Sequence, residues 1–255
     1  MSVRIACQTI TFGEDRHKND IEGIFKAVSE AGYTGIEIGS KRLELDRVNE
    51  YRELMSKYSL EMAALHMGTG FKDAEATANT KATFEKAVAI AKALGCKNIF
   101  TSGGGPKEVE NYFAIAGKQL NELGKSARAD GIRLSYHNHA RELEDNGFGM
   151  YTLAENSDPE NLSFVPDIGW IVRGNYDPVE YVKKAFDRIY HVHFKEFDAE
   201  GVITEIGKGV VNFKAVYDMV KDKPGIWIVA EQDRTAIGAE ASVKHNLLAI
   251  KKMGE

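Results

Sequence analysis

The feature that most constrains the fold of this 255-residue chain is a regular alternation of short apolar runs with longer amphipathic segments. Eight runs have the length of buried strands, and the segments between them carry apolar residues at helical spacing. Strands that alternate with helices pair in parallel, and eight such units favour a closed barrel over an open sheet. The sequence therefore predicts an α/β fold, a single (β/α)8 TIM barrel formed by residues 1–255 as one domain. The strands are expected at residues 3–8, 34–38, 60–66, 98–101, 132–137, 162–167, 189–195 and 226–231.

Glycine and proline mark several helix ends. Gly32 and Gly95 follow expected helices, where glycine readily takes the left-handed conformation that ends a helix. Asp177 and Pro178 form the pair expected at a helix start, a capping residue followed by proline in the first turn. The fifth helix is expected to be the weakest, because glycines surround its start. The helices are expected at residues 20–31, 46–58, 74–94, 107–129, 148–156, 178–186, 213–221 and 239–253.

Charge and cysteine content exclude several classes of protein. The formal net charge of −5 provides no basic surface for nucleic acid or for an anionic membrane. The two cysteines, Cys7 and Cys96, imply no disulfide framework and suit a reducing compartment. No apolar stretch approaches the roughly 20 residues that span a bilayer. Together with an N-terminus that lacks a signal-peptide pattern, this leads us to expect a cytoplasmic protein.

Four apolar runs in the second half of the chain end in His137, Asp167, His193 and Glu231. The carboxyl ends of the strands of a parallel barrel converge on one face, and that face carries the active site. Imidazole and carboxylate groups together are suitable ligands for manganese, iron, cobalt or zinc. The pattern therefore predicts one divalent metal ion held by these four residues.

Each of these residues also has a plain structural interpretation. Asp167 could cap the next helix, and Glu231 could form a buried ion pair with Arg234 or a lysine. At the fifth strand, His137 and His139 can both point inward, and His137 is preferred as the ligand because it is nearer the strand.

Further candidates lie on the same strand ends. Alternation along the seventh strand places His191, His193 and Lys195 on one side, and His191 is expected to contact substrate or else to be an ordinary core histidine. His66 and Glu37 end the third and second strands and are expected to contact substrate, or else to be structural. The glycine-rich stretch 101–106 lacks the Gly-Lys-Ser/Thr ending of a P-loop, and a flexible loop at the barrel mouth is the preferred interpretation.

The chain resembles the xylose isomerase-like TIM-barrel superfamily, often labelled sugar phosphate isomerase/epimerase, over essentially its whole length. The Glu-Gln-Asp run and the stretch 204–209 are most similar to the inosose dehydratase branch. The resemblance implies a divalent metal, commonly manganese, with zinc, cobalt, iron or magnesium as alternatives. It is carried by Tyr136-His137-Asn138-His139, Asp167-Ile168-Gly169-Trp170, His191-Val192-His193-Phe194-Lys195-Glu196 and Glu231-Gln232-Asp233.

The chain departs from the epimerase pattern at two positions. Ketose epimerases typically have a glutamate at the position matching His137, so that two glutamates exchange a proton across the metal. Here that carboxylate is replaced by imidazole, and Glu142 is expected to contact substrate or to serve as the alternative ligand from this segment. Trp170 stands where the resemblance predicts a substrate-contacting histidine.

The implied chemistry is proton abstraction next to a carbonyl group, with a metal-stabilised enediolate. Glu231 is the expected base, and His139 or Lys195 the expected proton donor. An isomerase or epimerase is the first interpretation, and a dehydratase or lyase acting on an inosose or a 3-keto-glycoside is the alternative. The expected partner is a small carbohydrate or cyclitol, with a homo-oligomer left open. A nuclease of this fold would need a basic groove, and a non-catalytic sugar-binding barrel is the remaining alternative.

Overall fold

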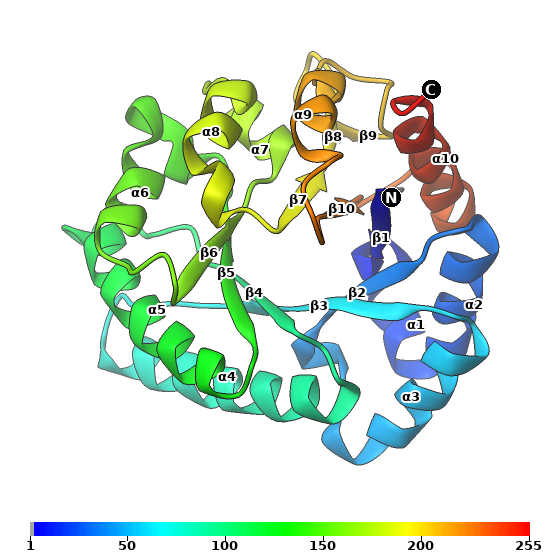
Figure 1. The fold of residues 1–255 in the computed structure, drawn as a ribbon, viewed down its shortest axis with the longest axis horizontal. Helices are drawn as coiled ribbons and strands as arrows, with labels where there is room; N and C mark the ends of the chain where they lie inside the picture. The colour runs from blue at the N-terminus through cyan, green and yellow to red at the C-terminus, as the bar shows by residue number, and fades with distance from the viewer. Residues whose placement is uncertain (1–2) are drawn as a thin grey trace.

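The computed structural model describes residues 3–255, and eight of its strands form a parallel barrel (Figure 1). The strand order is β6-β5-β4-β3-β2-β1-β10-β7. Parallel bridges between Phe164 and Ile189 and between Asp167 and His193 join β6 to β7 and close the ring. The (β/α)8 prediction is confirmed, and the predicted strand bounds agree with the structure to within two residues. The strands are β1 (Arg4–Gln8), β2 (Gly35–Gly39), β3 (Glu61–Gly68), β4 (Asn98–Ser102), β5 (Arg133–His137), β6 (Leu162–Val165), β7 (His191–Phe194) and β10 (Trp227–Ala230).

The helices surround the strands on the outside of the barrel (Figure 1). They are α1 (Gly13–Asn19), α2 (Ile21–Ala31), α3 (Val48–Lys57), α4 (Ala74–Leu94), α5 (Tyr112–Ala129), α6 (Glu144–Glu155), α7 (Ile168–Arg173), α8 (Pro178–Ala185), α9 (Phe213–Val220) and α10 (Ala239–Lys252). Among the described residues, no helix is both long enough and apolar enough to cross a lipid bilayer.

The capping residues act as the sequence predicts. Gly32 and Gly95 adopt left-handed φ values of 99° and 71° after α2 and α4. The Asp177 carboxylate accepts hydrogen bonds from the backbone N–H groups of Val179 and Glu180, with Pro178 in the first turn of α8. These local interactions satisfy backbone groups that a helix end leaves free, which is why the sequence alone locates them.

Two predicted helix starts differ from the structure by more than two residues. The fourth expected helix begins at Tyr112 and not at residue 107, because Asn111 adopts a left-handed φ of 58° that a helix cannot include. Helix α6 begins at Glu144, but Asp145, Asn146 and Gly147 all have positive φ. The regular part of α6 therefore begins at Phe148, where the sequence placed it.

Besides the short 3-10 helices, two helices and one hairpin have no counterpart in the predicted order. Helix α1 is almost wholly polar, with His17 as its buried residue, so it shows no apolar periodicity. Helix α7 has 6 residues, which is too short for a periodic pattern. A hairpin of β8 (Glu196–Phe197) and β9 (Ile203–Thr204) follows β7, and its two-residue strands give no alternation signal.

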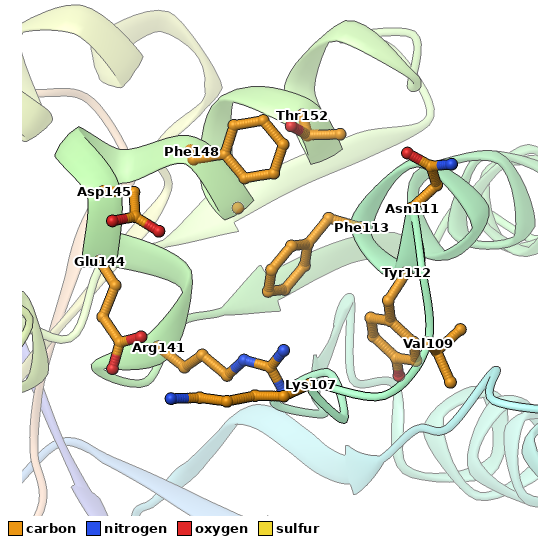
Figure 2. Close-up of a pocket in the computed structure, with 11 residues that line it drawn as sticks. Lys107, Val109, Asn111, Tyr112, Phe113, Arg141, Glu144, Asp145, Phe148 and Thr152 are labelled. Carbon is orange, nitrogen blue, oxygen red and sulfur yellow. The ribbon is translucent and has the colours of Figure 1, made fainter.

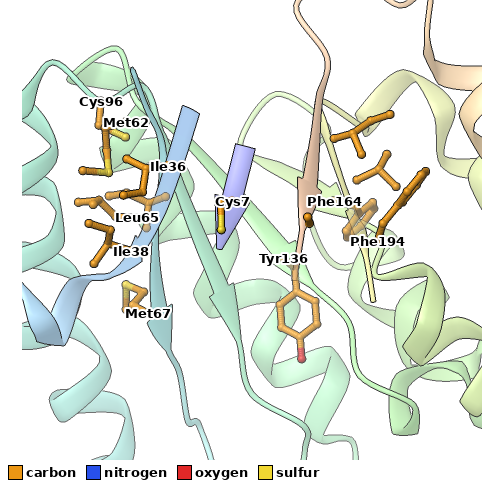
Figure 3. Packing of buried hydrophobic residues seen from close by; sticks show 14 of the residues in the cluster. Cys7, Ile36, Ile38, Met62, Leu65, Met67, Cys96, Tyr136, Phe164 and Phe194 are labelled. Carbon is orange, nitrogen blue, oxygen red and sulfur yellow. The ribbon is translucent and has the colours of Figure 1, made fainter. Parts of the chain in front are cut away.

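The main core lies between the barrel and its helices. Figure 3 shows Ile36, Ile38 and Leu65 packed in this layer, and all three are fully buried. Full burial of such a side chain contributes about 1.5–3 kcal/mol to folding. Inside the barrel, Phe100 and Val165 belong to a smaller apolar cluster. The apolar packing holds the strands in register and leaves their carboxyl ends to polar residues.

Candidate metal centre

The structure brings His137, Asp167, His193 and Glu231 together at the carboxyl ends of β5, β6, β7 and β10. All four are buried, and one ligand atom from each lies within 4.8 Å of the others. His137 Nε2 is 3.4 Å from Asp167 Oδ2 and 3.3 Å from Glu231 Oε2. His193 Nδ1 is 2.6 Å from the same oxygen of Glu231. Segments up to 94 residues apart in the chain thus form one compact cluster of nitrogen and oxygen donors.

The chemistry of this cluster fits a divalent cation. Within residues 3–255, the buried Asp167 Oδ2 has no hydrogen-bond partner. Burying a carboxylate oxygen without a partner is unfavourable, and a metal ion would satisfy it. Two imidazoles and two carboxylates form the mixed donor set that manganese, iron, cobalt and zinc accept.

Asp167 has two roles that the sequence presented as alternatives. Its Oδ1 accepts a hydrogen bond of 3.0 Å from the backbone N–H of Trp170 and caps α7. Its Oδ2 faces His137 in the cluster. The capping interpretation is confirmed, because α7 begins at Ile168 and not near Asp177, and the role of Asp167 as a metal ligand stays a prediction. The cap fixes the carboxylate so that its second oxygen points into the site.

Glu37 lies behind His193. His193 Nε2 is 3.0 Å from Glu37 Oε2, on the ring nitrogen that does not face the cluster. A carboxylate in this position orients a metal-binding imidazole and makes it a stronger ligand. Burial would lower the pKa of His193, but the carboxylates of Glu37 and Glu231 outweigh burial and raise that pKa to about 10. A cation at Nδ1 would take the place of the proton held there.

Lys195 lies beside the cluster. Its ammonium is 3.1 Å from Glu231 Oε1, 3.1 Å from both oxygens of Asp233 and 3.9 Å from Asp167 Oδ2. Burial would lower the pKa of Lys195, but Glu231 and the two aspartates raise it above its ordinary value. The sequence assigned no role to Asp233, although alternation two residues after Glu231 was an available signal. Burial and the charge of Glu231 raise the pKa of Asp233.

Glu142 is placed away from the metal donors. Its carboxylate accepts hydrogen bonds from the Tyr136 hydroxyl at 2.7 Å and from the His139 backbone N–H at 3.1 Å. The cluster of four is made with His137 from this segment, and Glu142 is not part of it. The Tyr136 hydroxyl also reaches the Gly103 carbonyl, so Glu142 helps to join two loops at the barrel mouth.

Two histidines border the cluster. The His139 ring contacts the rings of His137 and Trp170, with centroids 5.4 and 5.5 Å away, and burial lowers its pKa. His66 lies on another side, with Nε2 2.9 Å from the Ser102 hydroxyl and Nδ1 4.0 Å from Glu37. Their contact with substrate stays a prediction.

His191 lies deeper in the barrel than His193. Its ring packs edge-on against Phe100 with centroids 4.6 Å apart, and burial lowers its pKa well below the ordinary value. Neither ring nitrogen has a hydrogen-bond partner among the residues that the structure describes. His191 is therefore a neutral, buried ring beneath the site, outside the four-residue cluster.

A separate cavity of about 400 Å³ lies between the segment that leads into α5 and the start of α6. Figure 2 shows the side chains of Lys107 and Arg141 in the lower part of the view, with Phe113 and Phe148 above them. Glu144 and Asp145 also line it, so its charges are mixed and the cavity shows no preference for an anion. None of the four clustered donors is among the described residues that line it.

Comparison with known proteins places this architecture in a known group. The family model described as "Xylose isomerase-like TIM barrel" matches residues 25–253. An inosose dehydratase of Halalkalibacterium halodurans is 32% identical over 194 residues, which are 62% of this chain and 61% of that protein. An inosose dehydratase of Mesomycoplasma hyopneumoniae strain J is 27% identical over 247 residues, 81% of this chain and 79% of that protein. The chain thus matches less than two thirds of the length of the first of these relatives.

Solved structures agree in fold. The 3-keto-D-glucoside 4-epimerase of E. coli has a TM-score of 0.81 at 17% identity, covering 98% of this chain and 99% of that one. The IOLI protein, determined with a binding zinc atom, has a TM-score of 0.76 at 15% identity, covering 99% and 96%. At these identities the likeness concerns the barrel itself.

Proposed function

Because the chain belongs to the xylose isomerase-like TIM-barrel family, we propose that it is a metal-dependent carbon–oxygen lyase acting on a sugar-like ketone. The proposal depends on one observation: the Lys195 ammonium lies 3.1 Å from Glu231 Oε1 at the edge of the cluster. A base and a charged acid therefore stand side by side at the barrel mouth.

Elimination needs this combination. Glu231 Oε2 faces the donors of the cluster, whereas Oε1 is the oxygen that can take a proton from the carbon next to a carbonyl group. Lys195, kept charged by Glu231, Asp167 and Asp233, can donate a proton to a departing hydroxyl or alkoxyl oxygen. A divalent cation bound by His137, Asp167, His193 and Glu231 would polarise the carbonyl oxygen and acidify the neighbouring C–H.

Epimerisation is the second candidate. Moving a proton between two faces of one carbon requires a second base opposite Glu231, and the family resemblance matches His137 to the position of that carboxylate. Together with the contact between Lys195 and Glu231, this difference leads us to place a lyase before an isomerase or epimerase, which is the reverse of the sequence-based preference. The inosose dehydratase relatives also favour a lyase over an isomerase or epimerase. A keto-cyclitol is therefore the first substrate to test. Manganese remains the first metal to test on the family resemblance, and zinc is the second.

The two reactions are separated by isotope exchange. Metal-loaded protein is incubated in D₂O with ketoses, inososes and 3-keto-glycosides, and the products are followed by NMR and mass spectrometry. Loss of water or of an alcohol supports the lyase. Deuterium that enters an intact carbon skeleton, without elimination, supports the isomerase or epimerase. No reaction with any compound, despite bound metal, would contradict both.

Lys195→Gln tests the assignment of the acid. The variant removes the proton donor and retains the base, so exchange should continue while elimination falls by about 100-fold, within the range for loss of general-acid catalysis. Lys184→Gln, on the exposed surface of α8, is the matched control and should behave as the parent protein. Equal losses of exchange and elimination in Lys195→Gln would remove Lys195 from the acid role.

A further inference from the structure

A second cavity, of about 540 Å³, lies beside Trp170, whose backbone N–H is bonded to the cluster residue Asp167. Its lining comes from the segments that follow β6, β7 and β10, which contribute Trp170 of α7, then Phe197 and residues 201–203, and then residues 234–236. Three of the four clustered donors, Asp167, His193 and Glu231, come from the ends of the same three strands. The cavity is therefore built by the residues that directly continue the site.

Trp170 lies between the metal centre and the cavity. Its backbone N–H is bonded to Asp167, and its ring lies edge-on to His139. The Lys195 ammonium lies 5.3 Å from the centroid of the same ring. On the cavity side, Trp170 packs against Phe197 with centroids 4.9 Å apart. A ligand that reaches Lys195 would thus extend along Trp170 into the cavity.

The residues that line the cavity differ in chemistry from those of the metal centre. The centre presents carboxylates, imidazoles and an ammonium. The cavity is mainly apolar, with one guanidinium and one hydroxyl, and its lining residues are Trp170, Phe197, Gly201, Val202, Ile203, Arg234, Thr235 and Ala236. Val202 is 60% exposed, which leaves apolar surface in water. Trp170 Nε1 is buried and has no acceptor within the described part of the chain. The cavity therefore suits a planar, mainly apolar group that carries an oxygen atom as a hydrogen-bond acceptor.

Hydrogen bonds and close packing fix the segments that line the cavity before any ligand binds. Glu196 accepts hydrogen bonds from the backbone N–H groups of Phe197, Gly207 and Val211, which fastens the hairpin of β8 and β9. At Gly169, an added Cβ would lie 2.2 Å from the Lys195 carbonyl oxygen, so glycine is needed where α7 approaches β7. A preformed surface loses little conformational entropy when it binds.

From this arrangement we infer that the cavity binds the aglycone of a keto-glycoside, and that this aglycone is aromatic or otherwise planar. The inference rests on the proposed function, since it assigns the sugar ketone to the metal centre. A free inosose is a single hydroxyl-rich ring and would leave the aromatic surface uncovered. A glycoside places its oxygen-rich ring at the centre and its glycosidic oxygen beside Trp170.

Binding of unreactive glycosides tests the inference without catalysis. Dissociation constants of metal-loaded protein for phenyl β-D-glucoside and methyl β-D-glucoside are measured by calorimetry, with Trp170 fluorescence as a second readout. The phenyl compound should bind about tenfold more tightly, since aromatic packing and apolar burial together contribute about 1.4 kcal/mol. In Trp170→Phe the change in fluorescence on ligand binding should disappear. The chain's other tryptophan, Trp227, is buried at the start of β10 and does not line the cavity.

Val202→Asp places a charge among the residues that line the cavity. Because Val202 is exposed, the substitution should have little effect on the stability of the fold. The tenfold preference for the phenyl compound should fall to about twofold or less, since a charge disfavours an apolar neighbour. Val210→Asp is the matched control: Val210 is 57% exposed in the same loop region, and it does not line the cavity. Its preference should equal that of the parent protein.

Two results would overturn the inference. One is equal affinity for the phenyl and methyl compounds, and the other is a preference that Val202→Asp leaves unchanged. The proposed function fails separately. If no ketone undergoes elimination while the phenyl preference persists, the lyase proposal is wrong and the aglycone site stands. If inososes are dehydrated and the phenyl preference is absent, the aglycone site is wrong and the lyase proposal stands.

Discussion

The carboxylate of Glu37 lies 3.0 Å from Nε2 of His193, on the side of the ring that faces away from the candidate metal centre. Glu37 belongs to β2 and His193 to β7, and both are fully buried. The contact fixes which ring nitrogen of His193 faces the cluster. The residue that the sequence assigned to substrate thus supports a donor of the cluster.

Glu37→Gln should weaken metal binding by about 10- to 100-fold, because the amide no longer holds the proton of the imidazole as strongly. Metal affinity is measured by competition with a chromophoric chelator. Glu30→Gln, on the exposed end of α2, is the control and should bind as the parent protein does. An affinity unchanged in Glu37→Gln would show that Glu37 does not tune the site.

His137→Glu should restore the two-carboxylate pattern of the epimerases. We expect deuterium exchange without elimination to rise relative to elimination, because a second base then faces Glu231. The same change adds a third carboxylate beside Asp167 and Glu231, so the metal-free variant should lose about 3 kcal/mol of stability. Metal should recover this loss, seen as a larger shift in Tm on metal addition than in the parent. His137→Gln, which adds no charge, is the comparison, and an equal metal-induced shift in both variants would contradict the argument.

Phe100→Ala should destabilise the barrel by about 3–5 kcal/mol. Phe100 is fully buried inside the barrel, where its ring packs edge-on against both His191 and His193. The free energy of unfolding is measured with urea. Phe148→Ala is the control, because Phe148 is 61% exposed and its loss should change stability by less than about 0.5 kcal/mol. A small effect at Phe100 would mean that the interior around the two histidines collapses to fill the space.

Cys7 and Cys96 should both resist thiol reagents in the folded protein. Burial raises the pKa of Cys96 to about 12 and that of Cys7 further still. Little thiolate is present at pH 8 in the folded state, so reaction should be slow in buffer and rapid in urea for both residues. Fast reaction of either thiol in buffer would contradict its burial.

The same shift has a consequence for stability. The unfolded thiols ionise near pH 8.5, whereas the folded thiols do not. The buried thiols therefore contribute fully to the free energy of unfolding below about pH 8.5. This contribution is lost as the pH rises from there towards about 12. The loss of unfolding free energy between pH 7.5 and 9.5 should be smaller in Cys7→Ala/Cys96→Ala than in the parent. Equal losses in the two proteins would assign the effect to other groups.

The strand and helix order was predictable because it depends on neighbours in the chain. Apolar spacing and the caps at Gly32, Gly95 and Asp177 are local, and the structure agrees with them. The segments that the sequence missed, α1, α7 and the hairpin of β8 and β9, are short and show no periodicity. Their positions depend on packing against the barrel, as the close approach at Gly169 shows.

For the candidate site, the sequence determined which four residues lie at strand ends, because alternation and strand length place a residue on a face and at an edge. Only the tertiary structure decided what each of them contacts. The contact of Glu37 with His193, the pairing of Lys195 with Asp233 and the holding of Glu142 by Tyr136 join residues on different strands or loops. Such contacts depend on the closure of the barrel and on loop packing, which sequence periodicity does not encode.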